Sequence, residues 1–210
     1  MKLSIVSSAL LLAAACSSST KPAAKGRKNT SGGASGVTVR SIDWRNRTYD
    51  SSDIGPITVK DGVYEYALDG EGNVVAPDYK PTNPDEYVAH GSFKVTEPVF
   101  GDLDGDGTEE AVLVTYLNGG GTGRFSHISV YAVRDDKETV IGGIPGGDRG
   151  EGGIDDVKLQ GKVVIVSRMM SMADDGACCP SKLQHERWSW NGTSFVEDEA
   201  ARTMSDFGNK

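Results

Sequence analysis

Short alternating runs of apolar and polar residues, separated by two-residue turns that carry a glycine, most constrain the fold of this chain. Asp-Gly and Asn-Gly turns supply the positive φ angles that suit the twist of two antiparallel strands. The three candidate hairpins are Ile57–Lys60 with Val63–Tyr66 across Asp61-Gly62, Val157–Leu159 with Lys162–Val166 across Gln160-Gly161, and Trp188–Trp190 with Thr193–Val196 across Asn191-Gly192. The pattern therefore predicts antiparallel β-structure.

Two longer runs, Glu110–Leu117 and Phe125–Val133, support the same reading, and a glycine-rich loop joins them. In the second run Ser126, Ile128, Val130 and Ala132 fall on one side; the other side carries Phe125, His127, Ser129, Tyr131 and Val133. No repeat of propeller length is present. We predict an all-β domain, built as an antiparallel sandwich, a barrel or a strongly curved sheet.

Helical signals are weak. Asn83 is a good N-cap, Pro84 suits the first helical position, and Gly91 would end the segment, so one short helix is expected there. A further turn is expected within Glu197–Met204.

The N-terminus reads as an export signal. Met1-Lys2 is basic, Leu3–Ala15 is apolar but too short to span a membrane, and Cys16 follows small residues. This arrangement resembles a bacterial lipobox, which implies cleavage after residue 15 and a lipid on Cys16; an ordinary signal peptide cut at the same place is the alternative. With Ser17 after the cysteine, the resemblance implies the outer membrane or cell surface.

The remaining chain divides by composition into a tether (16–36), an all-β domain (37–200) and a C-terminal tail (201–210). The tether is rich in Ser, Gly and Lys and has no aliphatic residue larger than Ala, so it cannot form a core. The formal net charge is −8, and all 30 acidic residues lie after residue 36. Nucleic acid is therefore not an expected partner, because binding it needs a basic face. The basic tether can lie on anionic lipid or act only as a spacer.

Gly101–Glu110 carries the strongest chemical motif, with carboxylates at alternate positions and glycines between them. Such a curl turns several hard oxygen ligands toward one point, which suits Ca²⁺. We predict one calcium site; its ligands are the side chains of Asp102, Asp104 and Asp106, the carbonyl of Thr108, and Glu110 directly or through water. The alternative is an acidic turn without an ion, which leaves the carboxylates to repel one another.

The loop is not an EF-hand, because Leu113 stands where that motif has a bidentate glutamate. It resembles the D-x-D-G-D-G-x-x-E/D loop of FG-GAP repeats and related bacterial modules. One copy is present, so the resemblance implies the metal and not a propeller.

Cys178 and Cys179 are adjacent. In an exported protein two thiols usually pair, but neighbouring Cα atoms are closer than most disulfides allow. A vicinal disulfide, two buried thiols and intermolecular bridges all remain open, and a rigid turn is preferred to a redox role.

A wider resemblance covers most of residues 40–196. The chain is similar to a group of uncharacterised bacterial exported lipoproteins in its acidic loop, in Cys178-Cys179-Pro180-Ser181 and in the order of Asp43–Tyr49, Lys60–Gly62 and Gly147–Arg149. The resemblance implies no activity.

No recognisable catalytic arrangement is present. His90, His127 and His185 are expected to be surface or packed residues, and Trp188 and Trp190 to pack on a sheet face. Acids that a cleft could gather are Asp148, Glu151, Asp155, Asp156, Asp174 and Asp175. We therefore expect a membrane-anchored envelope lipoprotein, a calcium-stabilised binding or structural module whose partner is an envelope protein or glycan. The alternatives are an extracytoplasmic hydrolase with paired acids and a redox-responsive binder acting through Cys178-Cys179.

Overall fold

The computed structural model describes residues 36–51, 53–176 and 179–208. Residues from Gly36 onward form one unit, and that unit alone is discussed below. The expected signal peptide, Cys16 and nearly all of the expected tether lie outside the described residues, as does Cys178.

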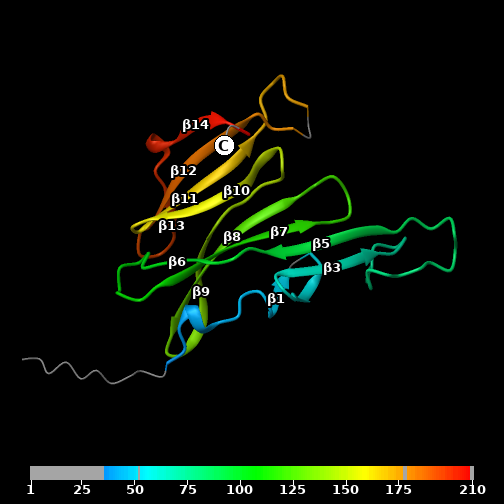
Figure 1. The fold of residues 1–210 in the computed structure, drawn as a ribbon, viewed down its shortest axis with the longest axis horizontal. Coiled ribbons are helices and arrows are strands. Elements are labelled where there is room, and N and C mark those ends of the chain that lie inside the picture. Colours follow the sequence, from blue (N-terminus) through cyan, green and yellow to red (C-terminus); the bar gives the residue numbers. More distant parts are fainter. Residues whose placement is uncertain (1–35, 52, 177–178, 209–210) are drawn as a thin grey trace, which may run out of the picture. The chain divides into compact units, whose positions relative to one another are not determined.

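Strands account for nearly all of the regular structure in the described residues (Figure 1). In chain order the elements are η1 (Val39–Ser41), β1 (Thr48–Ser51), β2 (Gly55–Thr58), β3 (Val63–Leu68), β4 (Val74–Val75), β5 (Ala89–Val95), β6 (Val99–Gly101), β7 (Glu110–Asn118), β8 (Phe125–Arg134), β9 (Lys137–Ile144), β10 (Glu151–Gln160), β11 (Val163–Met170), β12 (Lys182–Trp190), β13 (Phe195–Glu197), η2 (Glu199–Ala201) and β14 (Thr203–Asp206).

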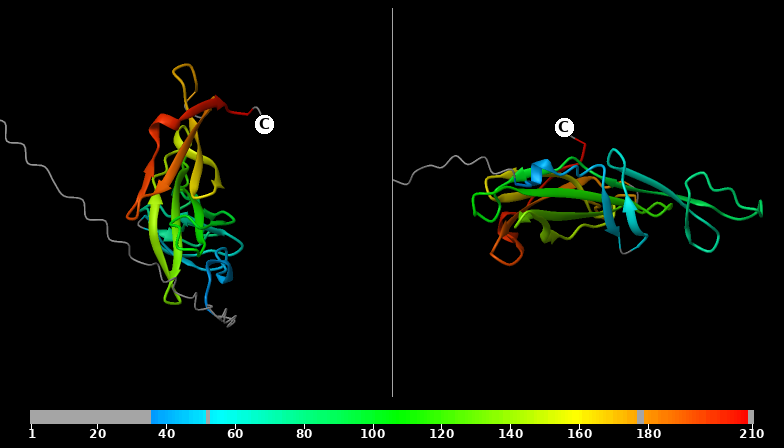
Figure 2. Two further views of the ribbon diagram at one scale, coloured as in Figure 1. Left: turned by 90° about the vertical axis from the view of Figure 1, so that its left-hand side faces the viewer. Right: turned by 90° about the horizontal axis from the view of Figure 1, so that it is seen from below.

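The strands form three antiparallel sheets. The large sheet has the order β4-β3-β5-β7-β8-β9, with β6 added beside β7. The small sheet has the order β10-β11-β12-β13, with β14 also paired to β12, and β1 pairs with β2 in an N-terminal hairpin. The predicted all-β class is therefore confirmed. In the part of the chain that the structure describes, the sheets do not close into a barrel. The small sheet packs on one face of the large sheet, as in a sandwich (Figures 1 and 2).

Two apolar cores cover opposite faces of the large sheet. Between the two larger sheets, side chains such as Val112, Ile128 and Val164 form the first core. On the other face, residues of the N-terminal segment, Trp44 and Ile57 among them, pack on the large sheet in a second core. Burying each such side chain contributes about 1.5–3 kcal/mol.

Strand β7 has an apolar core on each of its two faces, which explains its sequence. Val112 and Val114 belong to the first core, while Ala111 and Leu113 belong to the second. A strand covered on both faces needs apolar residues at successive positions rather than at alternate ones. In β8 the predicted alternation is confirmed, since Ser126, Ile128, Val130 and Ala132 are its buried residues.

The expected helix beginning at Asn83 is wrong. Asn83 Oδ1 accepts a hydrogen bond from the Asp85 amide at 3.1 Å, but only a turn forms, and β5 begins at Ala89. The segment has no apolar face to bury, and Tyr87 is 75% exposed. A helix this short is marginal without packing. The turn expected near the C-terminus is present as η2.

Of the three predicted hairpins, two are confirmed and one is wrong. Strands β10 and β11 pair directly, as do β12 and β13. At Asp61-Gly62 the turn forms with positive φ at both residues, but only Lys60 and Val63 bridge across it. Strand β2 then pairs with β1, and β3 pairs with β4 and β5, because Ile57 and Val59 are drawn into the second core.

The small sheet extends past the boundary expected at residue 200. Thr203–Asp206 forms β14, which pairs with the first half of β12, from Lys182 to His185. Four residues of the segment expected as a tail thus belong to the sheet.

Candidate metal centre

The acidic loop connects two paired strands of the large sheet. Gly101, the last residue of β6, lies opposite Glu110, the first residue of β7. Between them Leu103 is 2% exposed and packs in the first core, which anchors the loop to the sandwich. Gly105 and Gly107 have φ angles of +85° and +91°. These angles are available to glycine at little cost, so the loop can curl tightly.

The curl brings three aspartates together. Carboxylate oxygens of Asp102, Asp104 and Asp106 all lie within 4.8 Å of one another, so this group can hold a metal ion. Each aspartate also fixes the loop: Asp102 Oδ1 accepts a hydrogen bond from the Gly105 amide at 2.6 Å, and Asp104 Oδ1 accepts one from the Asp106 amide at 3.1 Å. The sequence thus supplies both the turn and its carboxylates.

Thr108 stabilises the third aspartate. Its amide and its hydroxyl both donate to Asp106 Oδ1, at 2.8 and 2.6 Å. These hydrogen bonds are the main reason that the pKa of Asp106 is lowered. Metal coordination through the carbonyl of Thr108 stays a prediction.

Glu110 is the buried member of the group. Its side chain is fully buried, and Oε2 accepts hydrogen bonds from the amides of Leu103 and Asp104 at 2.8 and 3.4 Å. Oε1 has no hydrogen-bond partner among the described residues. Burial raises the pKa of this carboxyl group, and the nearby charge of Asp104 adds to the rise. A buried oxygen without a hydrogen-bond partner is uncommon in proteins and calls for an explanation.

Arg134, which sequence reasoning missed, is the internal cation of this site. At the end of β8, it forms ion pairs with Asp104, with Asp106 at 3.0 Å and with Glu110 Oε1 at 3.5 Å. One guanidinium cannot neutralise four carboxylates. The register of β7 and β8 could have predicted the role of Arg134. Because Ala111 pairs with Tyr131, Arg134, three residues further along β8, lies beside the acidic loop that precedes β7.

A second basic side chain approaches from the small sheet. Lys162, in the β10–β11 turn, places Nζ only 2.0 Å from where a Cβ on Gly105 would lie. Any larger residue at position 105 would therefore displace the Lys162 side chain. The positive φ angle at this position would also strain the backbone of that residue.

Three of the other acids singled out in the sequence make contacts of their own, apart from the acidic loop. Asp148 Oδ1 accepts hydrogen bonds from the amides of Arg124 and Arg149, which lower its pKa. Asp156 pairs with Lys158 at 2.7 Å. Asp175 Oδ2 accepts from two backbone amides of the loop before β12.

The histidines and tryptophans also lie apart from the acidic loop. The His185 ring bridges Ser167 and Ser205, at 2.9 and 2.8 Å, and so links β11, β12 and β14. Trp188 and Trp190 pack against the first core, as expected. The Cys179 amide donates to the Gly176 carbonyl at 2.9 Å, and Cys178, the other residue of the possible vicinal disulfide, lies outside the described residues.

No protein-family model matches this chain, and neither does any curated protein. Within the described residues there is no helix of the length and apolarity needed to cross a membrane. The geometry itself supports an acidic group, anchored in the sandwich, that can hold a metal ion.

Proposed function

We propose that this chain is a lipid-anchored protein of the bacterial cell envelope whose β-sandwich is stabilised by one Ca²⁺ ion in the acidic loop. On this proposal the folded domain is a binding or structural module and not an enzyme. The observation that carries the metal is Glu110 Oε1, a fully buried oxygen without a hydrogen-bond partner beside three clustered aspartates.

Calcium suits the chemistry of this group. It takes six to eight hard oxygen ligands in a tolerant geometry, whereas Mg²⁺ demands a near-ideal octahedron and keeps several waters. Asp102, Asp104, Asp106 and Glu110 offer four carboxylates, and the carbonyl of Thr108 offers a fifth oxygen source. No nitrogen or sulfur ligand lies in the described loop, which disfavours zinc.

A structural role follows from where the loop is attached. Leu103 lies in the first core, and Glu110 begins a strand that is covered by both cores. An ion that fixes the curl would therefore also fix the β6–β7 connection at the centre of the large sheet. Millimolar calcium outside the cytoplasm keeps even a weak site filled.

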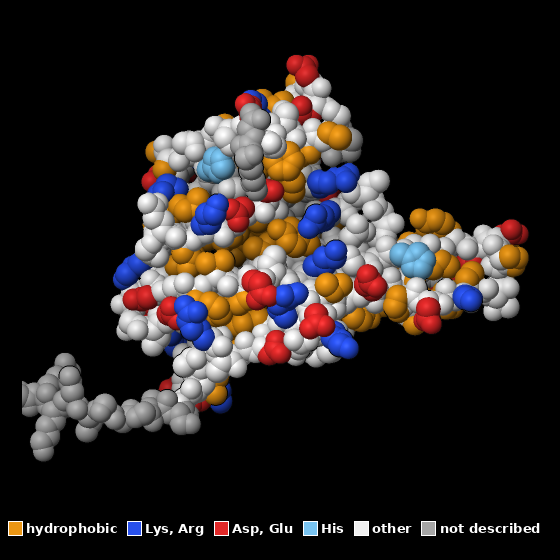
Figure 3. All heavy atoms as spheres, in the orientation of Figure 1, with side chains coloured by type: hydrophobic (Ala, Val, Ile, Leu, Met, Phe, Trp, Pro, Cys, Tyr) orange, Lys and Arg blue, Asp and Glu red, His pale blue; other side chains and the backbone are white. Residues whose placement is uncertain are grey.

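The proposed location depends on the N-terminal sequence. A lipid on Cys16 would hold the module at the membrane, with the basic tether between the lipid and the acidic domain. Acidic and basic side chains are interspersed over the face shown in Figure 3. An envelope protein or glycan is the proposed kind of partner, because the lipid would hold the domain among envelope components.

Thermal unfolding in calcium and in EDTA tests the metal. We expect calcium at ~100 times Kd to stabilise the fold by about 2.7 kcal/mol. That corresponds to a rise in Tm of roughly 5–10 °C for a domain of this size. Asp104→Asn should abolish most of the rise, whereas Asp156→Asn, which removes a carboxylate from the small sheet, should keep it. Equal melting curves in calcium and EDTA would rule the metal out, and an equal response to magnesium would rule out calcium selectivity.

Cell fractionation tests the anchor. Cys16→Ala should release the protein from the membrane fraction, and continued retention would contradict lipidation. Titrating thiols of the unfolded protein, with and without reductant, decides whether Cys178 and Cys179 are paired.

A further inference from the structure

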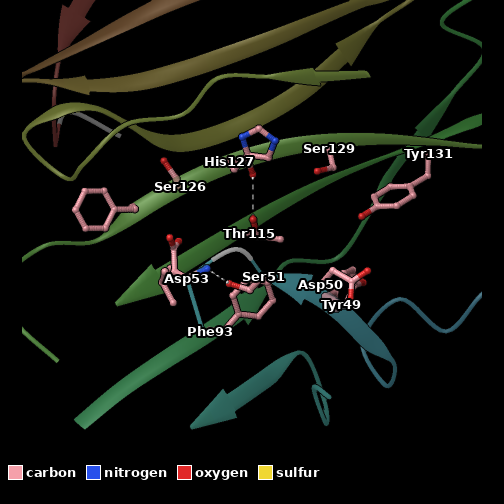
Figure 4. Close-up of a pocket in the computed structure, with 12 residues that line it drawn as sticks. Tyr49, Asp50, Ser51, Asp53, Phe93, Thr115, Ser126, His127, Ser129 and Tyr131 are labelled. Carbon is pink, nitrogen blue, oxygen red and sulfur yellow. Dashed lines mark hydrogen bonds between the residues drawn. The ribbon is translucent and has the colours of Figure 1, made fainter. Parts of the chain in front are cut away.

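Two cavities on the large sheet differ in charge. The one drawn in Figure 4 lies between the N-terminal hairpin and β8, and Asp50 and Asp53 line it. Arg47 lies over the Tyr49 ring there, 5.2 Å from its centroid, and compensates the negative charge. The wall of the other cavity, of about 160 Å³, consists of Ser92, Lys94, Tyr116, Asn118 and Arg124. It has two cations, and no carboxylate belongs to the described residues of its wall.

Strand pairing brings the wall of this second, basic cavity together. In the register of β5 and β7, Lys94 lies opposite Tyr116. The next pair on the same face is Ser92 with Asn118. Arg124 comes from the turn before β8, and its Cζ lies 4.5 Å from the centroid of the Tyr116 ring. This ring therefore has one cation on the neighbouring strand and another over its face.

The arginine and the ring are held in place by the sandwich. The Tyr116 hydroxyl donates to the carbonyl of Ile154 at 3.1 Å, and the Arg124 amide donates to Asp148 Oδ1 at 2.6 Å. A guanidinium that stacks on a ring keeps the N–H donors at its edge for a ligand. Groups that are fixed before a ligand arrives lower the entropic cost of binding it.

The two cations of the wall have no counter-ion among the described residues. Neither Lys94 nor Arg124 forms an ion pair with a described carboxylate, whereas most arginines of the domain do. The paired ones are Arg40, Arg45, Arg47, Arg134, Arg168 and Arg202. Two like charges at one cavity repel each other, and an anion between them would relieve that repulsion.

The acids of the surrounding strands lie outside the wall. Burial raises the pKa of Tyr116, and the charges of Asp155 and Asp156 add to the rise. Asp156 has a lysine partner at 2.7 Å. Glu65, on the neighbouring strand β3, is exposed. None of these three carboxylates lines the cavity, so the space between the cations is left to a ligand.

The wall is rich in hydrogen-bond donors. Lysine and arginine side chains can only donate, and the Ser92 hydroxyl can donate as well. Asn118 Oδ1 accepts from the Gly120 amide at 2.8 Å, which leaves the amide nitrogen of Asn118 as a donor. Such a wall suits an oxyanion. Two positive charges match a phosphate group, with a charge of about −1.5 to −2 near neutral pH, better than a singly charged carboxylate.

We propose that the basic cavity binds one phosphate group, free or as an ester. Arg124 and Lys94 balance its charge, and Ser92 and Asn118 donate neutral hydrogen bonds to it. The volume is below the range typical of drug-sized ligands and suits a single group of this size. This site goes beyond the proposed calcium role and shares no residue with the candidate metal centre.

Titration of the folded chain with inorganic phosphate and with glucose 6-phosphate, followed by ¹H–¹⁵N NMR, tests the proposal. We expect both to move the amide signals of Lys94, Asn118 and Arg124, and acetate at equal ionic strength to bind about tenfold more weakly. The two phosphates distinguish an ester from the free anion by which of them binds more tightly. The glucose 6-phosphate titration is repeated in EDTA and should give the same shifts, so a chain without a calcium response would still bind phosphate.

Two variants localise the binding. Arg124→Gln and Lys94→Gln should each weaken phosphate binding about tenfold, and both side chains are exposed, so the fold should not change. Lys137→Gln removes an exposed cation that does not line the cavity and should leave binding unchanged.

The pH dependence gives an independent readout. Phosphate binding should weaken from about pH 7.5 to about pH 5, because the ligand then gains a second proton and loses charge. Equal binding of acetate, full affinity in Arg124→Gln, or an affinity that stays constant over this pH range would each overturn the proposal.

Discussion

Two buried glutamates, Glu186 in the small sheet and Glu110 in the large sheet, differ in one respect that separates a structural ion pair from a ligand site. Both are less than 5% exposed, and each lies beside an arginine. Around Glu186 every oxygen is used: Oε2 accepts from Arg168 Nε at 2.7 Å and from Trp188 Nε1 at 2.8 Å, and Oε1 accepts from Gln184 Nε2 at 2.7 Å.

Arg168 is equally complete. Its remaining nitrogens donate to the carbonyls of Gly152 and Pro145, at 3.1 and 2.6 Å. Glu110, by contrast, has one oxygen bonded to backbone amides and the other without a hydrogen bond, and its arginine is shared with two aspartates. A closed network needs nothing more, whereas the open one has room for an additional positive charge. The first site is therefore a complete ion pair, whereas the second lies beside an aspartate group that can hold a metal ion.

The largest expected effect comes from breaking the closed pair. Glu186→Ala leaves Arg168 buried without a countercharge and should cost about 3–5 kcal/mol in the free energy of unfolding. Glu186→Gln, which keeps an acceptor for Arg168, should cost less. Urea unfolding measures both, with Asp206→Asn, a change at the exposed pair with Lys182, as a control near ~0–1 kcal/mol. A loss for Glu186→Ala as small as that of the control would contradict a structural role.

The next largest effect is at Glu110, where the stability difference between Glu110→Gln and the wild type should change sign between EDTA and calcium. In EDTA, Glu110→Gln removes a buried charge that lacks a full set of partners, so the variant should be more stable than the wild type by about 1–3 kcal/mol. In saturating calcium the order should reverse, because glutamine supplies a weaker ligand than a carboxylate. Melting curves in both buffers measure the crossing. If the wild type is the more stable protein in EDTA as well, the oxygen is not a free ligand.

Sequence predicted the parts of these sites that are local. The carboxylates of the acidic loop and the glycines that let it curl are contiguous, and the structure confirms that Asp102, Asp104 and Asp106 come together. The strand at Glu110–Asn118 and the Gln160-Gly161 turn were equally readable, because their signals lie within a few residues. The alternation expected along that strand is wrong, since its first five residues are all buried.

The contacts that the sequence could not predict are those made by the pairing of strands distant in the chain. Arg134 reaches the loop only through the register of β7 and β8, and Arg168 meets Glu186 only through the pairing of β11 and β12. The Asp61-Gly62 turn misled for the same reason, since burial of Ile57 in the second core, not the turn, selected the partner of β2. Tertiary burial overrode a correct local signal.

A smaller effect sharpens the role of Arg134. In EDTA, Arg134→Gln should lose about 1 kcal/mol, because the carboxylates then repel one another without an internal cation. The stabilisation by calcium should grow by a similar amount, since the ion no longer competes with the guanidinium for Asp104 and Asp106. Lys158→Gln, at the exposed pair with Asp156, is the matched control. If the site bound no calcium and Arg134 alone balanced its carboxylates, the Arg134→Gln variant would lose the same stability in calcium and in EDTA.

The smallest effect concerns Asp148, a carboxylate that is not buried and whose hydrogen bonds come from the backbone. Asp148 is held by the backbone amides of Arg124 and Arg149, and these bonds lower its pKa in the folded state. The unfolded chain, with a pKa of about 3.9 for aspartate, therefore binds the proton more readily. The stability that Asp148 contributes is fully present above that value and is lost as the pH falls through the lower pKa of the folded state.

Asp148→Asn tests this sign, because the amide keeps an oxygen acceptor but cannot titrate. Measured in EDTA to exclude calcium, the difference in Tm between the wild type and the variant should be largest near neutral pH and should shrink as the pH falls toward 3. A constant difference over that range would show that the carboxylate charge adds nothing. The expected difference is smaller than that at either buried glutamate, because Asp148 is only partly buried and its amide partners can hydrogen-bond to asparagine as well.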